Sequence, residues 1–575
     1  MILNYLKPYT KRIVLGTSIK MLGALLELVL PLILAYIVDS LVPLGQISRI
    51  IIWGGVMVLA AVLAWVTNIG ANRMASWVSA QSVRRIRRDL FVRIMDLSAK
   101  QVDNYTIPSL ESRLTTDTYN LHRFIGSVQR LGVRAPMLFL GGIFFCFIQE
   151  WRLALILLLL LPPIAWLLLY VSRNSFPRFR QLQRNIDDMV RVVRENIQGI
   201  RVIKALDKTE YEKKHFSETN QEVADSEEDA NLFMSFTNPA IDLILNSGLT
   251  LVLIIGGYMV FNVMTMPGVI ISFLSYFIQI TNALMSLNRM FVIYNRSSAS
   301  AERIAEVLNT PQAREQRIAD FPAHKQSEAE ASPYAVEFDH VTFRYSGGAP
   351  ALKDINFKLK QGESLGIIGA TGSGKSTIIN LLLRHYDVSE GEILLNGRPL
   401  RSYPLDDLHT RFGIVYQNDF LYADTVRNNI DFGRDFTDEE ILDAAENAQA
   451  LEFIEEKEGG LDFRLEQKGV NLSGGQKQRV LLSRALSGQP EILILDDSSS
   501  ALDFATDARL RQALAKNYAD TTTIIIAQRI SAIQHCEHIL LLAEGENIGY
   551  GTHQELLESS QLYRQIAEQQ MGGIA

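Results

Sequence analysis

The sequence predicts an α-helical domain with six membrane spans and long cytoplasmic helical extensions, followed by an α/β domain. Three observations support this. Hydrophobic residues make up 48% of the 575 residues, which is high for a protein without membrane segments. Long apolar runs stop near residue 295, and the stretch 310–332 is polar, as linkers are. Short β-type runs then alternate with helical patterns. We therefore expect a membrane domain at 1–309, a linker at 310–333 and the α/β domain at 334–575.

The membrane domain is predicted from apolar stretches of sufficient length. A helix needs about 20 mostly apolar residues to cross the hydrocarbon core, and six stretches meet this requirement: 13–37, 50–71, 130–149, 152–172, 238–262 and 268–292. Short turns join the third to the fourth and the fifth to the sixth. The connections 72–129 and 173–237 are much longer, charged and helical in period, so helices two to five should extend well beyond the bilayer.

The distribution of positive charge predicts the orientation of these helices. Lys and Arg crowd the two long connections and are nearly missing from the opposite loops. Because positive loops stay in the cytoplasm, the long connections, both termini and the α/β domain should be cytoplasmic, in a chain embedded in the cell membrane. The net charge of −7 gives no basic field that would favour nucleic acid.

A phosphate-binding loop opens the α/β domain. The segment GATGSGKS at 369–376 fits G-x-x-x-x-G-K-[ST], with the strand-like SLGIIG before it and the helical STIINLLL after it. Backbone N–H groups of such a loop surround phosphate oxygens, Lys375 reaches the β- and γ-phosphates, and Ser376 binds Mg²⁺. The predicted ATP contacts in this loop are Gly369, Thr371, Gly372, Ser373, Gly374, Lys375, Ser376 and Thr377.

Two further motifs follow the loop. The apolar run ILILD ends at Asp496, a carboxylate suited to hold Mg²⁺ through water. The segment LSGGQ lies before it, at 472–476. With both phosphate motifs around it, LSGGQ resembles the signature of ATP-binding-cassette (ABC) proteins. Together with the six preceding spans, the chain resembles an ABC exporter half-transporter over nearly its whole length, with ATP and Mg²⁺ as the implied cofactors.

The resemblance implies roles for further residues. Tyr345 stands where the family stacks an aromatic ring on adenine, and Gln417 where it places a glutamine against Mg²⁺. Glu466 resembles an acidic residue near the intracellular helices. The segments SLESRLTTD and ENIQGIRVIKALDKTEYE resemble the two cytoplasmic connections whose short coupling helices rest on the cassettes. Two implied sets act across a pair of cassettes: the signature Ser473, Gly474, Gly475 and Gln476, and the D-loop Ser500, Ala501, Leu502 and Asp503.

Two positions depart from the family pattern. Hydrolysing cassettes normally carry Glu directly after the Walker B Asp, which is Asp496 here, and this chain has Asp497 at that position. They also carry His after the next apolar run, IIIA, where this chain has Gln528. The Glu polarises the attacking water and the His supports the γ-phosphate. An intact signature beside these changes predicts a heterodimer with a degenerate, weakly hydrolysing site on this chain and a partner half-transporter that supplies Glu and His. A slow homodimer that tolerates Asp as the base is the alternative.

The transported substrate is the least specified feature. Lys20 and Glu27 lie in an apolar span, and the candidate pathway residues are Glu27, Asp242, Asn246, Gln279 and Asn282. Pairing between helices explains such residues equally well. If Glu27 faces a cavity that accepts cations, it should select cationic substrates. The heterodimer pattern resembles bacterial multidrug pumps and favours small amphipathic compounds, with a lipid flippase, an ATP-gated channel or a signalling partner as alternatives.

Overall fold

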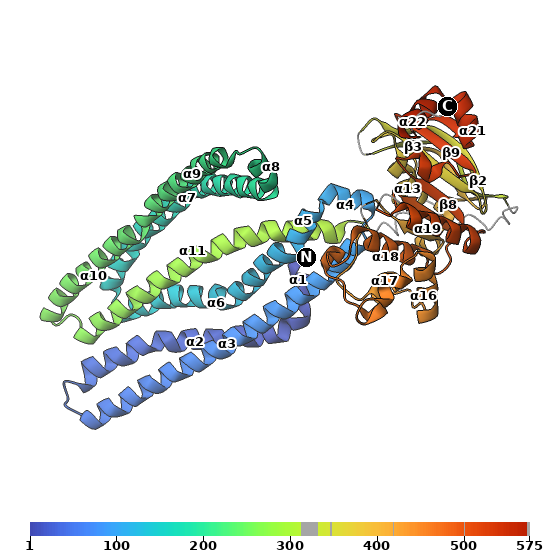
Figure 1. The fold of residues 1–575 in the computed structure, drawn as a ribbon. Helices are drawn as coiled ribbons and strands as arrows, with labels where there is room; N and C mark the ends of the chain where they lie inside the picture. Colours follow the sequence, from blue (N-terminus) through green and yellow to red (C-terminus); the bar gives the residue numbers. More distant parts are fainter. Residues whose placement is uncertain (312–331, 346–347, 418, 499–500, 572–575) are drawn as a thin grey trace. The chain divides into compact units, whose positions relative to one another are not determined.

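The computed structural model describes residues 1–311, 332–345, 348–417, 419–498 and 501–571 (Figure 1). The chain divides into two compact units. The first unit contains residues 1–94 and 108–310, and the second contains residues 95–107 and 311–575. Most of the expected linker, 312–331, lies outside the described residues.

The described part of the first unit contains helices and the turns that join them, and no strand. After the short α1 (Ile2–Leu6), its helices are α2 (Thr10–Tyr36), α3 (Ile47–Met95), α5 (Ile107–Ser112), α6 (Thr118–Gln149), α7 (Trp151–Gln198), α8 (Ile200–Ala205), α9 (Thr209–Ser235), α10 (Thr237–Phe261) and α11 (Pro267–Asn309). A one-turn π-helix, η2 (Ile37–Leu41), continues α2, and another, η3 (Arg113–Asp117), precedes α6.

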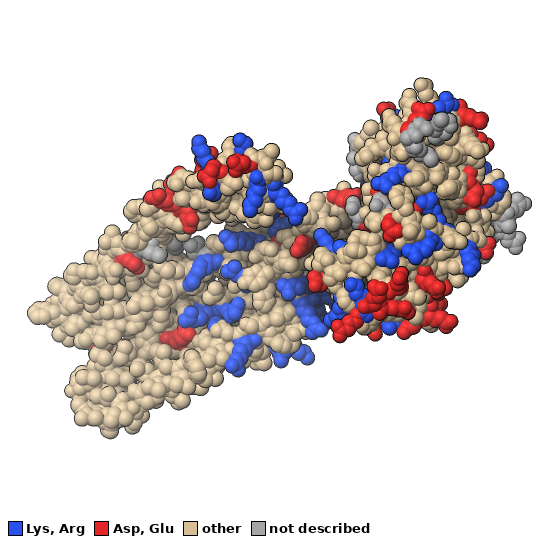
Figure 2. Space-filling view, in the orientation of Figure 1, with Lys and Arg blue, Asp and Glu red and all other residues tan. Residues whose placement is uncertain are grey.

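Six helical stretches of this unit are long and apolar enough to cross a membrane, which confirms the predicted six spans. Each contains 40 to 53 residues, about twice the 20 that a bilayer requires. Figure 2 shows few charged side chains at the end of the unit where α2 joins α3 and α10 joins α11, whereas Lys and Arg gather farther along the helices. The helices therefore have an apolar part and a charged extension, as the sequence predicted.

Close helix packing forms the core of the first unit. The buried cluster joins α2, α6, α7, α10 and α11, and Tyr276 at its centre donates a hydrogen bond to the carbonyl of Leu28. Glycine permits the approach of α6 to its neighbours, because a Cβ at Gly141 would lie 2.4 Å from Cδ1 of Leu28. Such close contacts are typical of membrane helices, which associate through packing of small residues.

The second unit contains two sheets. Strands β1 (Tyr334–Arg344), β2 (Pro350–Lys360), β4 (Glu390–Leu395) and β5 (Arg398–Pro399) form an antiparallel sheet in the order β2-β1-β4-β5. The larger sheet has the order β10-β9-β3-β8-β7-β6. Its strands are β3 (Ser364–Gly369), β6 (Phe412–Val415), β7 (Ile492–Asp496), β8 (Thr522–Ile526), β9 (His538–Ala543) and β10 (Glu546–Gly551), and only β10 pairs antiparallel.

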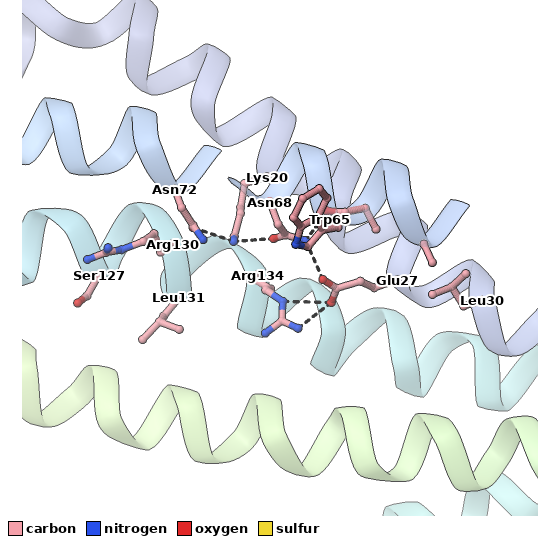
Figure 3. Close-up of a pocket in the computed structure, with 12 residues that line it drawn as sticks. Lys20, Glu27, Leu30, Trp65, Asn68, Asn72, Ser127, Arg130, Leu131 and Arg134 are labelled. Atoms are coloured by element: carbon pink, nitrogen blue, oxygen red, sulfur yellow. Dashed lines mark hydrogen bonds and ion pairs between the residues drawn. The ribbon is translucent and has the colours of Figure 1, made fainter. Parts of the chain in front are cut away.

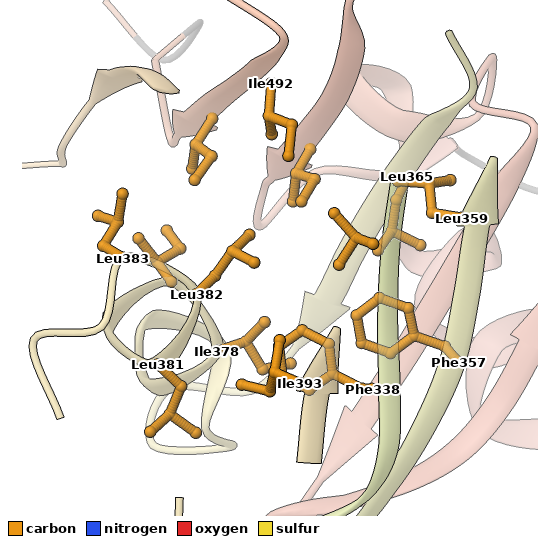
Figure 4. Close-up of a cluster of buried hydrophobic side chains, with 14 of the residues drawn as sticks. Phe338, Phe357, Leu359, Leu365, Ile378, Leu381, Leu382, Leu383, Ile393 and Ile492 are labelled. Atoms are coloured by element: carbon orange, nitrogen blue, oxygen red, sulfur yellow. The ribbon is translucent and has the colours of Figure 1, made fainter. Parts of the chain in front are cut away.

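The main core of this unit lies between the two sheets and α13 (Lys375–Leu382) (Figure 4). Phe338 of β1 and Phe357 of β2 stack with ring centroids 4.6 Å apart, and Leu365 and Ile378 pack in the same cluster. The apolar run before the phosphate loop is thus buried strand, and the run after it is buried helix. The carboxyl ends of β3 and β7 consequently meet at one edge of the sheet, where ligands bind in such folds.

A helical layer completes the second unit. It contains α15 (Val426–Asp431), α16 (Asp438–Asn447), α17 (Leu451–Glu455) and α18 (Gly474–Leu486), which bury a second apolar cluster against β6 and β7. Four helices lie outside that cluster: α14 (Leu405–Thr410), α20 (Ile530–Ile533), α21 (His553–Ser559) and α22 (Gln561–Met571); α19 (Phe504–Asn517) contributes Leu510 to it. The helical domain followed by an α/β nucleotide-type domain confirms the predicted fold class.

The short helix α4 (Ala99–Tyr105) belongs to this second unit although it lies between spans in the sequence. Its Asp103 accepts a hydrogen bond from the hydroxyl of Tyr386. The helix immediately precedes the segment SLESRLTTD, which forms α5 and η3 of the first unit. The helix that belongs to the second unit, α4, therefore lies one helix before SLESRLTTD, the segment that resembles a family connection.

Candidate functional site

The phosphate loop connects β3 to α13, and two of its positions are glycine because a side chain there would clash with neighbouring atoms. A Cβ at Gly369 would lie 2.2 Å from the carbonyl oxygen of Leu542, so a side chain would push β3 away from β9. Gly374 has φ +101° and caps α13, and a Cβ there would lie 2.5 Å from Cδ2 of Leu352. The loop thereby presents its backbone at the N-terminus of a helix, where anions are favoured.

Two polar side chains of the loop are prepared for an anion. Nζ of Lys375 donates to the carbonyls of Gly369 and Ala370, at 2.8 Å each, so the ammonium is held over the loop. Ser373 is 3% exposed, and its hydroxyl has no hydrogen-bond partner within the described part of the chain. A buried hydroxyl without a partner is costly, and a phosphate oxygen would supply one.

One pocket of about 430 Å³ brings most of the predicted ATP residues together. Its lining includes Tyr345, Thr371, Gly372, Gly374, Lys375, Ser376, Thr377, Gln417, Asp496, Asp497 and Gln528. Gly369 and Ser373 lie in the same loop but do not line the pocket. Sequence reasoning did not name Ala351, Ile526 and Ala527, which also line it and carry no polar side chain that a motif could identify.

The electrostatics of this pocket favour a cation beside the phosphates. Burial raises the pKa of Asp496, and the charge of Asp497 raises it further, while Lys375 opposes both effects. Burial lowers the pKa of Lys375, against the attraction of the two carboxylates. Oxygen atoms of Ser376, Gln417 and Asp496 converge here, and such hard donors suit Mg²⁺. The donor set therefore fits the metal that the motifs predict.

The two departures from the family pattern lie in this same pocket. Asp497 follows β7 with φ +52°, and its N–H donates to the carbonyl of Ile526 on β8. Gln528 follows β8, and its carbonyl accepts from the side chain of Gln570. A short carboxylate and a neutral amide thus occupy the wall around Lys375 where a longer base and an imidazole were expected from the resemblance.

Tyr345 lies at the rim of the pocket. Its ring packs edge-on against Phe343 and Tyr386, with centroids 4.8 and 5.2 Å away, and its hydroxyl lies 3.3 Å from that of Thr377. The side chain is 37% exposed. A ring held by two aromatic neighbours and open on one side is suited to stack on a base.

The signature lies outside this pocket, at the N-terminus of α18. Ser473 is the N-cap: its hydroxyl accepts from the N–H of Gln476, whose side chain accepts from the N–H of Ser473. Ser473 and Gly474 are exposed, and no described side chain lies within 4 Å of a Cβ built at Gly474. The reciprocal cap fixes an exposed helix N-terminus of the kind that binds anions.

The described part of the D-loop leads into α19. Asp503 is the N-cap of that helix, and its carboxylate accepts a hydrogen bond from the N–H of Thr506. This hydrogen bond holds the pKa of the Asp503 carboxyl below its usual range. Leu502 packs on the helical-layer cluster, and Ala501 is exposed. Ser500 lies outside the described residues. Glu466 is exposed, and its N–H donates to Asn471.

In the first unit the structure separates the candidate pathway residues. Glu27 accepts hydrogen bonds from Arg134 and Asn68, and Lys20 donates to Asn68 and Asn72, so the pairing alternative describes both residues. The remaining candidates are dispersed. Asp242, Asn246 and Asn282 are exposed on their helices, and Gln279 is half-buried with no partner for its buried side-chain oxygen among the described residues.

Sequence reasoning missed the basic partners of this polar group. Arg130 and Arg134 lie within the predicted span 130–149, and an ionisable residue in an apolar stretch is itself the signal that would have found them. Asn68 and Asn72, at the end of the second span, give no comparable signal, because their role depends on where α2 and α6 lie. With Arg134 paired to Glu27, the carboxylate is not a free acceptor for cations.

Comparison with known proteins places both units in one group. The family model described as the ABC transporter transmembrane region matches residues 13–284, and the ABC transporter model matches residues 352–500. The chain is 35% identical to the uncharacterized ABC transporter ATP-binding protein YfiB of Bacillus subtilis over 99% of this chain and 98% of that protein.

Two further proteins extend the comparison. The ATP-dependent lipid A-core flippase of Yersinia pestis is 32% identical over 91% of this chain and 90% of its own length. The solved structure of a bacterial Atm1-family ABC exporter with ATP bound superimposes with a TM-score of 0.77 at 23% identity, covering 98% of this chain and 99% of that one. This likeness shows the shared fold.

Proposed function

This chain belongs to the ABC transporter family and is an ATP-driven exporter subunit, and from that premise we propose that it pairs with a different half-transporter. Its own cassette contributes a degenerate ATP site, and its signature completes the partner's site. The assembly moves small amphipathic compounds out of the cytoplasm. It is a multi-pass protein of the cell membrane, with both termini in the cytoplasm.

The observation that carries the proposal is the separation of two features. Asp497 and Gln528 line the same pocket as Lys375, whereas Ser473 lies outside it at an exposed helix terminus. A site that binds ATP but hydrolyses it poorly does not require an intact signature sequence. An intact, exposed signature is useful if it meets a phosphate bound by another chain that has a competent base.

The chemistry of the pocket supports slow hydrolysis. Asp is one methylene shorter than Glu, about 1.5 Å, and a misplacement of about 1 Å can lower a rate roughly 10²-fold. Gln528 cannot carry the positive charge that His supplies near the γ-phosphate. Lys375 and the loop N–H groups would still hold the phosphates, and Tyr345 would stack on the adenine. Ser376 and Asp496 would supply oxygen ligands to Mg²⁺, which would neutralise phosphate charge when bound.

Transport in inside-out vesicles tests the export direction. Vesicles that contain this chain and its partner should accumulate an amphipathic fluorescent compound when ATP is added, and vesicles with this chain alone should accumulate little. A vesicle with Lys375→Ala on this chain separates ATP binding from assembly. ATP-dependent ion conductance without solute accumulation would contradict the proposal and support a gated channel.

A lipid flippase is the second candidate, because a relative covering 91% of this chain is described as a lipid A-core flippase. Reconstituted assembly should then move a labelled phospholipid between leaflets at a rate that ATP increases. Lipid movement without transport of amphipathic solutes would favour this candidate. Robust turnover by the single chain would instead favour a homodimer in which Asp497 suffices as the base.

A further inference from the structure

A pocket of about 670 Å³ opens between α2, α3 and α6 of the membrane unit (Figure 3). Its charged lining residues are mostly basic: Lys20 comes from α2, and Arg130 and Arg134 come from α6. Glu27 is the single acidic residue of the lining. Three cations and one carboxylate leave the pocket with a net charge of +2 when all four groups are ionised.

The partners of these groups show where the positive charge is compensated. Nε and Nη2 of Arg134 donate to the same oxygen of Glu27, at 3.1 and 2.8 Å, so these two charges neutralise each other. Nε of Arg130 donates to the carbonyl of Gly126, a neutral acceptor. The carboxylate is therefore committed to one of the three cations, and Lys20 and Arg130 have no ion-pair partner among the lining residues.

Lys20 is the group that most requires an anion. It is 4% exposed, and its ammonium donates to the amide oxygens of Asn68 at 2.6 Å and Asn72 at 3.0 Å. An ammonium has three donors, and within the described part of the chain the third has no partner. Amide oxygens carry no charge, and a buried cation without a counter-ion is strongly disfavoured in a membrane span.

The pocket also has apolar lining residues. Leu30 of α2, Ala61, Ala64 and Trp65 of α3 and Leu131 of α6 line it, and the Trp65 side chain is 65% exposed. Figure 3 shows Trp65 on the same side as Asn68, with Lys20 and Arg134 beside them. A ligand that fits this lining has a negatively charged group next to an apolar body.

We propose that this pocket binds the anionic group of an amphiphile, with its apolar part along Trp65 and Leu131. The inference rests on the proposed export of amphipathic compounds and specifies their charge. Lys20 supplies the buried counter-charge, Arg130 adds a second at the edge, and the Glu27–Arg134 pair positions α2 against α6. Cations are disfavoured, which reverses the selectivity suggested by Glu27 alone.

A matched pair of probes tests the charge requirement. Dansyl-undecanoic acid and its methyl ester share one apolar body, and only the acid carries a charge. The full chain, alone and with its partner, is placed in phosphatidylcholine nanodiscs without nucleotide, and energy transfer from Trp65 is measured against a Trp65→Phe reference. The acid should bind at least ~10-fold more tightly than the ester, because two uncompensated cations lie in a weakly screened site.

Three variants separate net charge from structure. Lys20→Gln with Arg130→Gln removes both uncompensated charges and should abolish the preference for the acid. Glu27→Gln with Arg134→Gln keeps the net charge at +2 and should retain the preference. Glu27→Gln alone raises the net charge and should strengthen acid binding several-fold, whereas a cation site would lose binding of cations and gain nothing for the acid.

The source of the anion and the integrity of the variants are resolved in the same assay. Addition of phosphatidylglycerol to the discs displaces the probe if the ligand is a lipid headgroup, and leaves it bound if the ligand is a solute. ATP binding through Lys375 shows whether each variant is folded. If the Lys20→Gln with Arg130→Gln variant does not assemble, the two variants that contain Glu27→Gln still test whether the pocket prefers the acid. Equal binding of acid and ester, or weaker acid binding by Glu27→Gln, overturns the inference. The assay requires neither transport nor hydrolysis, so its failure leaves the proposed heterodimer untouched.

Discussion

At the scale of single residues, the proposal that one cassette contributes to two different sites depends on Asp497 and Ser473. Asp497 lines the pocket of its own phosphate loop, and Ser473 caps an exposed helix outside it. If the two residues serve different ATP molecules, their removal should have unequal effects.

In the assembled pair, Asp497→Asn should lower steady-state ATP hydrolysis by less than about 3-fold, because the proposed base already contributes little. Ser473→Arg should lower it by about 10²- to 10³-fold, since one lost transition-state donor costs this much and a bulky side chain obstructs the partner's phosphate. ATP hydrolysis by the two single variants, beside trapped-nucleotide stoichiometry, measures the difference. Loss of activity in Asp497→Asn with retention in Ser473→Arg would reverse the proposed division.

The residue scale also shows the limit of motif reading. The glycines of the phosphate loop were predicted because their spacing follows from phosphate geometry, and Gly369 and Gly374 have no room for a side chain. Lys20 was noticed as an ionisable residue in a span, but its partners were not. Asn68 and Asn72 are 48 and 52 residues away in sequence, and only helix packing brings them to its ammonium.

At the scale of elements, α4 lies between two membrane spans in the sequence and belongs to the second unit. Asp103 of α4 accepts a hydrogen bond from the hydroxyl of Tyr386. Burial raises the pKa of Tyr386, and the Asp103 carboxylate raises it further. Tyr386 in turn packs edge-on against Tyr345 at the rim of the ATP pocket. A ring contact and a hydrogen bond thus join Tyr345 to α4 through Tyr386.

Tyr386→Phe should weaken this link while it keeps the ring packing. A hydrogen bond to a charged group contributes about 1.5–3 kcal/mol, so we expect ATP affinity to remain within about 2-fold and transport per ATP hydrolysed to fall several-fold. Asp103→Asn should have a similar effect, and the double variant should add little to either. Tyr550→Phe is the matched control, because its hydroxyl donates to the carbonyl of Lys358 on β2 and not to α4. Equal losses in the control would assign the effect to general destabilisation.

A second element-scale feature stabilises the extension of the membrane helices. Asp117 of η3 is 1% exposed and accepts from Ser300 at 2.8 Å and from Nε of Arg303 at 2.9 Å, both on α11. Asp117→Asn should lower the free energy of unfolding by about 2 kcal/mol, because buried hydrogen bonds to a charge are lost. Thermal unfolding in detergent measures this. Asp188→Asn removes the exposed pair with Arg191 and should change little; equal shifts in both variants would contradict the expectation.

At the scale of the whole molecule, the sequence predicted the order of the domains and the six spans because both depend on composition over 20 or more residues. Most of the residues that it predicted as ATP contacts line one pocket, since β3 and β7 deliver their motifs to one sheet edge. It did not predict that α4 joins the second unit. Contacts such as that of Asp103 with Tyr386, 283 residues apart in sequence, are not encoded by any local pattern.

The last prediction concerns assembly. A pair of identical chains would contain Asp497 and Gln528 in both sites, so the purified chain alone should hydrolyse ATP at least ~10²-fold more slowly than the complex with its partner, given the sensitivity of such reactions to base position. Asp497→Glu with Gln528→His should then raise the activity of any homodimer, since a longer base and a cationic partner return to the pocket of Lys375. Lys375→Ala in the same background is the control and should abolish the gain. Steady-state ATP hydrolysis with and without the partner measures each case. Fast, cooperative turnover by the unaltered single chain would show that Asp497 suffices as the base and that the partner is unnecessary.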